Sequence, residues 1–308
     1  FKEKIMDSML REDINFINKF LYSVQKHRIM LSNWMDAKKR DGIESTPRQI
    51  LLYEALEKQE NIAKKMARDI VEMTPIWAEF FENTKGVAEC LATSLLAEIG
   101  DIKRFGTVSK LWAYAGLLGG YYLASCENGH KLILSSDHHK TCPVFSNEND
   151  EPCSGLIKID EHIEGQSPKR KKGYHFLFNG NLKTICWKVA EQMRKQGDDY
   201  YKKIYYGELE KQGYVRTLKS KKEETDPDKY EYTALPHAKI PKMHAMNRAN
   251  RKVMKRFLSH LWEAWTALEG GDVRPPYVIE KLGHQGYVKW ADLKQQIAET
   301  REKIKKVS

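Results

Sequence analysis

Residues 86–117 read GVAECLATSLLAEIGDIKRFGTVSKLWAYAGL. Apolar residues recur at helical spacing on both sides of Gly100-Asp101, which predicts two helices joined by a tight turn. Arg104 and Lys110 lie near the turn and early in the second helix, where they could contact phosphates. Small residues keep the first helix thin, so another backbone could approach it closely: Ala88, Ala92, Ser94 and Ala97.

The order Leu-Leu-Ala-Glu-Ile-Gly-Asp, Arg-Phe and Leu-x-x-Tyr-Ala-Gly-Leu in this stretch carries a family resemblance. It resembles the C-terminal domain of bridge-RNA-guided insertion-sequence transposases that have a DEDD-type RuvC-like domain. That domain is similar to the Nop domain of box C/D ribonucleoproteins and to the Nop-like domain of Tas proteins, the effectors of tandem interspaced guide RNA systems. The resemblance continues more weakly through residues 173–189 and 241–265.

The composition favours a polyanionic partner. The 308 residues carry a formal net charge of +10, which favours nucleic acid before a membrane. No apolar run approaches the roughly 20 residues of a membrane span. Five unevenly spread cysteines predict a reducing compartment, so we expect a cytoplasmic protein of a prokaryotic cell or its virus. The chain begins with Phe1, and we expect a fragment without the N-terminal nuclease domain of the resembling families.

The charge is distributed unevenly along the chain. Residues 118–166 contain three Lys and eight acidic residues, a net charge of −5. Residues 167–260 contain twenty-three Lys and Arg against ten Asp and Glu, a net charge of +13. This asymmetry places the expected nucleic-acid surface in the second segment and turns the acidic segment away from it.

The periodicity predicts a mainly α-helical protein with few strand signals, at 132–134 and 156–159. Helices over residues 9–36 and 47–73 form a hairpin. It is either part of an ordinary bundle or, as the resemblance implies, a coiled-coil arm for dimerisation. The expected domains are the arm (1–80), a helical hairpin of a Nop-like core (81–124), a Cys/His insert (125–166), and the basic helical remainder with a C-terminal helix (167–308).

Two basic clusters are candidates for contact with RNA or DNA. Each is either an ordinary solvated surface or a phosphate-binding site, and we favour the second. The first begins the helix predicted over 243–268 and comprises His244, Arg248, Arg251, Lys252, Lys255 and Arg256. The second lies on a loop and comprises Lys169, Arg170, Lys171, Lys172 and Tyr174. In the resembling families a Leu-Lys or Leu-Arg helix follows such a loop, and this resemblance implies that Lys183 also contacts nucleic acid.

Cys126, His130, Cys142 and Cys153 are candidate ligands of a structural zinc ion. Three thiolates and one imidazole are a common tetrahedral set, and the ion would help to fold a segment poor in apolar residues. His138 or His139 could replace His130, and uncoordinated surface cysteines are the alternative.

Evidence for catalysis is sparse. The resembling transposases use a serine downstream of Tyr-Ala-Gly-Leu together with an acidic domain; Ser154 is the nearest formal match, with Ser125 and Ser167 as others. We therefore expect a homodimeric guide-RNA-binding protein that presents RNA to target DNA. Cleavage or recombination would need a RuvC-like or HNH domain outside this chain. The alternative is a fragment of an RNA-guided transposase or recombinase with a serine nucleophile.

Overall fold

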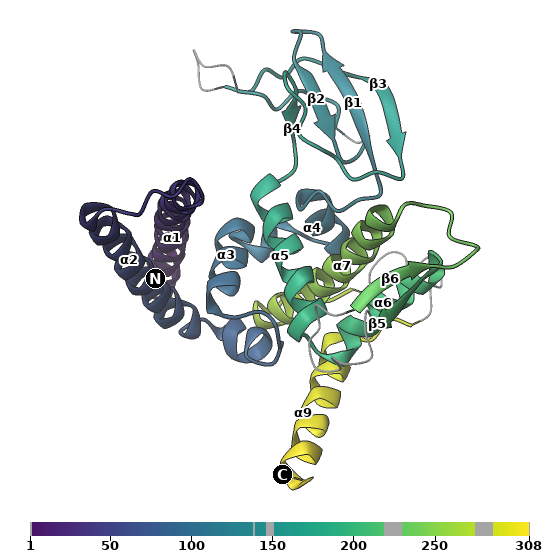
Figure 1. The fold of residues 1–308 in the computed structure, drawn as a ribbon. Coiled ribbons are helices and arrows are strands. Elements are labelled where there is room, and N and C mark those ends of the chain that lie inside the picture. Colours follow the sequence, from purple (N-terminus) through teal and green to yellow (C-terminus); the bar gives the residue numbers. More distant parts are fainter. Residues whose placement is uncertain (1, 138, 146–150, 219–229, 275–285, 308) are drawn as a thin grey trace. The chain divides into compact units, whose positions relative to one another are not determined.

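The computed structural model describes residues 2–137, 139–145, 151–218, 230–274 and 286–307. The fold is mainly helical and includes a small four-stranded sheet (Figure 1). Two compact units divide at the turn of the stretch quoted above, with Phe1–Asp101 in the first and Ile102–Ser308 in the second. Within the described residues, no helix combines the length and apolarity that crossing a membrane requires.

The first unit consists of α1 (Lys2–Arg40), α2 (Pro47–Glu72), a π-helical turn (Trp77–Phe81) and α3 (Glu89–Ile99). The start of α2 is fixed locally. Thr46 caps it, and the Thr46 backbone N–H donates a hydrogen bond to Gln49 Oε1 at 2.9 Å. Pro47 occupies the first helical position, where its missing N–H costs nothing. Both long helices of the hairpin therefore form, and α1 is longer than expected.

Small residues of α3 pack against neighbouring helices inside the first unit. Thr93 and Ser94 are buried, and α3 packs against both α1 and α2. The Thr93 hydroxyl donates to the Ala67 carbonyl of α2 at 3.2 Å, and the Ser94 hydroxyl donates to Asn18 Oδ1 of α1 at 2.8 Å. The close approach that the small residues allow is thus made by two neighbouring helices of the same unit.

The second unit is arranged around α7 (Lys242–Leu268). The helices that contact it are α4 (Val108–Tyr114), α5 (Gly180–Gln196), α6 (Asp199–Lys211) and α9 (Trp290–Val307), together with a 3-10 turn (Ile102–Arg104). Every residue from 257 to 265 is buried, so the second half of α7 is core on all sides. Leu268, the last residue of α7, is exposed.

The four-stranded sheet has the order β3-β1-β2-β4. It comprises β1 (Gly120–Cys126), β2 (Lys131–Leu134), β3 (Ile157–Glu164) and β4 (His175–Phe176). β1 pairs antiparallel with β2 and β3, and β2 pairs parallel with β4. A separate hairpin joins β5 (Tyr214–Leu218) and β6 (Tyr230–Ala234). The structure therefore has more strand than the sequence signals predicted.

Gly116, in the Tyr-Ala-Gly-Leu sequence, occupies a position that no other residue fits well. Its φ is +63°, in the left-handed region that favours glycine. A Cβ atom there would lie 2.8 Å from Cδ2 of Phe178, a buried ring just before α5. The backbone after α4 can pass this ring only because residue 116 has no side chain.

Candidate functional site

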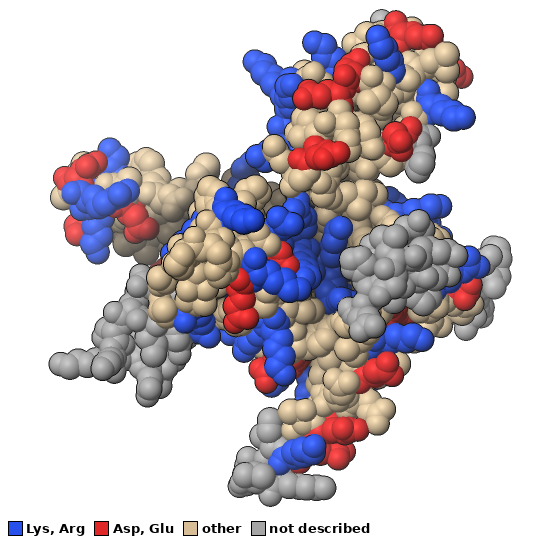
Figure 2. All heavy atoms as spheres, turned by 90° about the vertical axis from the view of Figure 1, so that its right-hand side faces the viewer, with Lys and Arg blue, Asp and Glu red and all other residues tan. Residues whose placement is uncertain are grey.

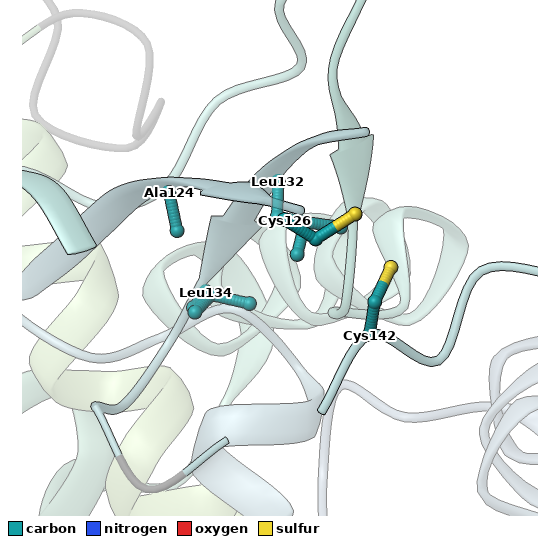
Figure 3. Close-up of a cluster of buried hydrophobic side chains, with 5 residues drawn as sticks. All are labelled: Ala124, Cys126, Leu132, Leu134 and Cys142. Atoms are coloured by element: carbon teal, nitrogen blue, oxygen red, sulfur yellow. The ribbon is translucent and has the colours of Figure 1, made fainter. Parts of the chain in front are cut away.

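The four predicted metal ligands come together in the second unit. Cys126 ends β1, His130 lies in the turn before β2, and Cys142 and Cys153 lie between β2 and β3. Their ligand atoms all lie within 4.8 Å of one another. Figure 3 shows the Cys126 and Cys142 side chains converging beside the apolar side chains of the sheet. His139 is exposed and outside this cluster, and His138 lies outside the described residues.

The spacing of the ligand atoms fits a tetrahedral ion. His130 Nδ1 lies 3.4 Å from Cys126 Sγ and 3.7 Å from Cys142 Sγ, and the Cys126 and Cys153 sulfurs lie 3.9 Å apart. Around zinc, metal–ligand distances of ~2.3 Å for sulfur and ~2.0 Å for nitrogen imply separations of about 3.8 Å for S–S and about 3.5 Å for S–N. These three separations are those of a tetrahedral site, so the group could hold a metal ion.

Backbone hydrogen bonds in the loop hold two of the sulfurs in place. The Cys142 N–H donates to the Gly155 carbonyl at 2.9 Å, and the Cys153 N–H donates to the Val144 carbonyl at 2.8 Å. A hydrogen bond from the Gly155 backbone, then one from the Asn128 side chain, lowers the pKa of Cys153 to about 6. Burial raises the pKa of Cys142 to about 11. A bound cation would stabilise the thiolate and so offset the rise in the pKa of Cys142 that burial causes.

Ser154 belongs to this loop. Its backbone has a φ of 54°, its N–H donates to the Cys142 carbonyl at 3.0 Å, and its hydroxyl donates to the Pro152 carbonyl at 3.1 Å. Ser125 lies on β1, where its hydroxyl donates to Asp160 of β3 at 2.9 Å. Both serines thus have local hydrogen-bonding roles in the sheet part of the unit.

A groove of about 950 Å³ lies among the loop before β4, α5 and α7. It brings together five of the residues predicted to bind nucleic acid, from both basic clusters: Lys169, Lys183, His244, Arg248 and Arg251. No Asp or Glu is among the described residues that line it. We call this site the basic groove. In Figure 2, Lys and Arg side chains gather around a hollow near the centre of the view.

The cations of the basic groove raise one another's electrostatic energy. Burial, followed by the charges of Arg251 and Lys169, lowers the pKa of Lys183 to about 8. Burial and the neighbouring Arg248 likewise lower the pKa of Arg251. Lys183 Nζ donates to the Pro168 carbonyl at 2.5 Å, and Arg251 Nη1 donates to Ser167 Oγ at 3.0 Å. These neutral acceptors leave the positive charge in excess, so an anion would be stabilised here.

Apolar side chains also line the basic groove: Leu117, Trp187, Pro241, Met243 and Met254. Trp187 and the neighbouring Lys188, both on α5, were not predicted as site residues. A signal for them exists in the sequence. The buried stripe of α5 runs through Leu182, Ile185 and Val189, so position 187 lies off that stripe. An aromatic residue there, close to two lysines, is the signal that could have identified the site.

Lys252, Lys255 and Arg256 of α7 are not among the residues that line the groove. Lys252 pairs with Glu208 of α6 at 2.8 Å, and Arg248 also reaches Glu208 at 3.6 Å. Lys255 stacks on Trp112, with Nζ 4.8 Å from the ring centre, and Arg256 stacks on Tyr287 at 4.4 Å. The basic residues of this first cluster therefore have several different partners.

The other predicted contacts lie outside the residues that line the basic groove. Arg104 stacks on Phe105 and Tyr114, while Lys110 is exposed at the surface of α4. Arg170 stacks on Phe176 at 4.9 Å, Lys171 stacks on Tyr174 at 4.6 Å, and Lys172 is exposed.

Comparison with known proteins relates part of the chain to a family. No curated protein and no solved structure is significantly similar to the chain. The match is a family model described as the IS116/IS110/IS902 transposase family, and it covers residues 78–120. This segment holds α3, α4 and the Tyr-Ala-Gly-Leu sequence that ends beside the basic groove, and it is transposase-related.

Proposed function

We propose that this protein binds a guide RNA and presents it for base pairing with target DNA. The observation that carries the proposal is the basic groove, where cations from a loop, α5 and α7 meet without an acidic residue among the described lining residues. Its charges would bind phosphates and leave sequence reading to the RNA. The resemblance to Nop-like and Tas proteins and the transposase-related segment both favour this function over an unguided DNA-binding protein.

The Cys/His cluster is proposed to hold zinc. Three thiolates and one imidazole are ligands that zinc prefers, and the distances between them match its tetrahedral geometry. Four protein ligands leave no open position for a substrate, so the ion would be structural. It would fix the ends of β1 and β3, where Cys126 pairs with Ile157.

The hairpin arm of α1 and α2 is proposed to form a homodimer. No residue between 25 and 59 is buried within the first unit, although this part of the arm carries many large apolar side chains. Ile29, Met30 and Trp34 on α1 are exposed, as are Leu51 and Leu52 on α2. A second copy of the hairpin would cover such a surface, as the coiled-coil arm of Nop-like proteins implies. A cytoplasmic location in a prokaryotic cell or its virus accords with this assignment.

The groove is tested by removing its charge. Replacing Lys183, Arg248 and Arg251 with Ala should weaken RNA binding at low salt and flatten the slope of log Kd against log salt by about two to three, because up to three phosphate contacts are lost. The matched control replaces Lys158, Lys203 and Lys239, which are exposed lysines of the same unit outside the groove lining. Equal losses in both variants, or an unchanged slope in the first, would reject the groove as the RNA site.

A second function, recombination through a serine nucleophile, is favoured by the position of Ser167. Its hydroxyl lies in the basic groove and accepts a hydrogen bond from Arg251, so a phosphodiester bound there would lie beside a nucleophile. With an acidic RuvC-like domain supplied, Ser167→Ala should abolish strand exchange while RNA binding remains. Ser125→Ala, on β1, is the control. Full strand exchange by Ser167→Ala excludes this function.

A further inference from the structure

Trp187 is the aromatic residue that the basic groove leaves in contact with solvent. Its relative exposure is 37%, whereas its neighbours Cys186 and Val189 on α5 are fully buried. An indole ring that faces a groove gives up the packing that large aromatic side chains normally make. Such a ring can recover this packing by stacking against the flat face of a ligand.

Charge and apolar surface occur side by side in this groove. Lys183 and Trp187 are four residues apart on α5 and therefore lie on the same side of the helix, one turn apart. Arg251 approaches from α7, and Met243 adds apolar surface from the same helix. A phosphate alone would use only the cations, and an apolar ligand would use only the ring and the methionine. A nucleotide, with a charged phosphate and a planar base, would use both.

Resting on the proposed function, we propose that the basic groove binds an unpaired nucleotide of RNA, with its base stacked on Trp187 and its phosphate held by Lys183 and Arg251. A base within a duplex has both faces covered by its neighbours, so only an unpaired base can stack on a protein ring. A cavity of about 950 Å³ has room for a nucleotide and part of the adjoining backbone.

Polar groups on the rim favour RNA over single-stranded DNA. Asn247, His244 and Gln166 line the groove beside the cations. Amide and imidazole groups can exchange hydrogen bonds with a ribose 2′-hydroxyl, which DNA lacks. The stacking of the base on Trp187 does not depend on its identity, so the site fixes where an unpaired nucleotide lies rather than which one it is.

The test changes the ring and leaves the charges in place. Trp187→Leu should weaken binding of a short single-stranded RNA of mixed sequence by about 5- to 100-fold, the loss expected when one base–aromatic stack is removed. Its salt slope should equal that of the wild type, because no cation is lost. Trp187→Phe, which retains an aromatic face, should restore most of the affinity. Phe145→Leu is the control, since Phe145 is an exposed aromatic of the same unit outside the groove lining.

Four further probes separate the possible outcomes. The same strand without bases, and the same strand in an RNA duplex, should bind wild type and Trp187→Leu equally; a DNA strand of that sequence should bind more weakly than the RNA. RNA containing 5-iodouridine should photocrosslink to Trp187.

Four results would overturn the proposal. Trp187→Leu could bind single-stranded RNA as tightly as the wild type, or it could lose as much affinity for the abasic strand as for the intact one. The wild type could bind DNA as tightly as RNA, or the crosslink could map to another residue. Wild-type protein that binds no RNA at all would reject the proposed function itself. If the variant lacking Lys183, Arg248 and Arg251 loses RNA binding while Trp187→Leu keeps it, only the nucleotide site is rejected.

Discussion

Lys183 links a single side chain to a measurable pH dependence. Its pKa is lowered to about 8 by burial and by the charges of Arg251 and Lys169. The protonated amine is the form that attracts phosphate, so RNA affinity should fall as the pH rises through about 8. Lys183→Arg should flatten this part of the profile, because a guanidinium stays charged. The measurement is Kd for a short RNA against pH at constant ionic strength.

Lys188→Arg provides the control for this pH profile. Lys188 also lines the groove on α5 but is exposed. The variant should keep the wild-type dependence on pH. A wild-type affinity that does not change through this pH range, or a profile that Lys183→Arg leaves unaltered, would contradict the role given to Lys183.

At the scale of residues, the sequence predicted which segments carry positive charge, but it did not predict which side chains those basic residues would contact. Lys169 and Arg251 were predicted from basic runs and Lys183 from the family resemblance, and the three meet in one groove although they are distant in the chain. Lys255 and Arg256 belong to the same run and stack on aromatic rings instead. Those rings lie far from α7 in the sequence, so a local pattern cannot reveal them.

At the scale of elements, we expect the stability of the sheet to depend on a metal ion held by the Cys/His cluster. Purified protein should contain about one zinc ion per chain, because the four ligands form a single tetrahedral site. Removing the metal with a chelator should increase hydrogen exchange in β1 and β3 while α5 and α7 keep their protection. Cys142→Ser should act like the chelator, and Cys186→Ser, a buried cysteine on α5, should not lower the metal content. Metal-free protein whose sheet is equally protected would refute the assignment.

Helices were predicted more accurately than strands because their signals are local. Thr46 and Pro47 mark the start of α2 within a few residues, and its end came within one residue of the prediction. In contrast, β3 is exposed along most of its length and shows no alternation of buried and exposed residues. Its pairing with β1 joins segments more than thirty residues apart, and the four ligand positions give no measure of strand length. The Cys/His spacing nevertheless identified the correct four residues for the cluster.

At the scale of the whole molecule, the hairpin arm should determine the oligomeric state. Met30→Glu combined with Leu51→Glu places charges on the exposed apolar surface of α1 and α2, and should convert a dimer into a monomer because a buried carboxylate is costly. Analytical ultracentrifugation measures the outcome. Met73→Glu, at an exposed apolar residue just after α2, is the control and should remain dimeric. A double variant that stays dimeric, or a monomeric wild type, would contradict the proposal.

Charge along the chain anticipated where the groove would lie, since residues 167–260 carry a net charge of +13 and provide every cation that lines it. The division into units was harder to foresee. The stretch 86–117 is continuous in sequence, yet α3 packs with the arm helices while α4 packs with α7. Helix periodicity shows which residues are apolar, but it does not show which neighbour will cover them.

The backbone at Gly116 bears on what a transposase signature means. This glycine lies within the matched segment, and the ring of Phe178 leaves no space for a larger residue. Steric fit is therefore sufficient to explain why this residue is glycine. A protein related to transposases could therefore lose strand transfer and still keep the Tyr-Ala-Gly-Leu sequence, because replacing the glycine would disturb the fold whether or not the protein catalyses a reaction.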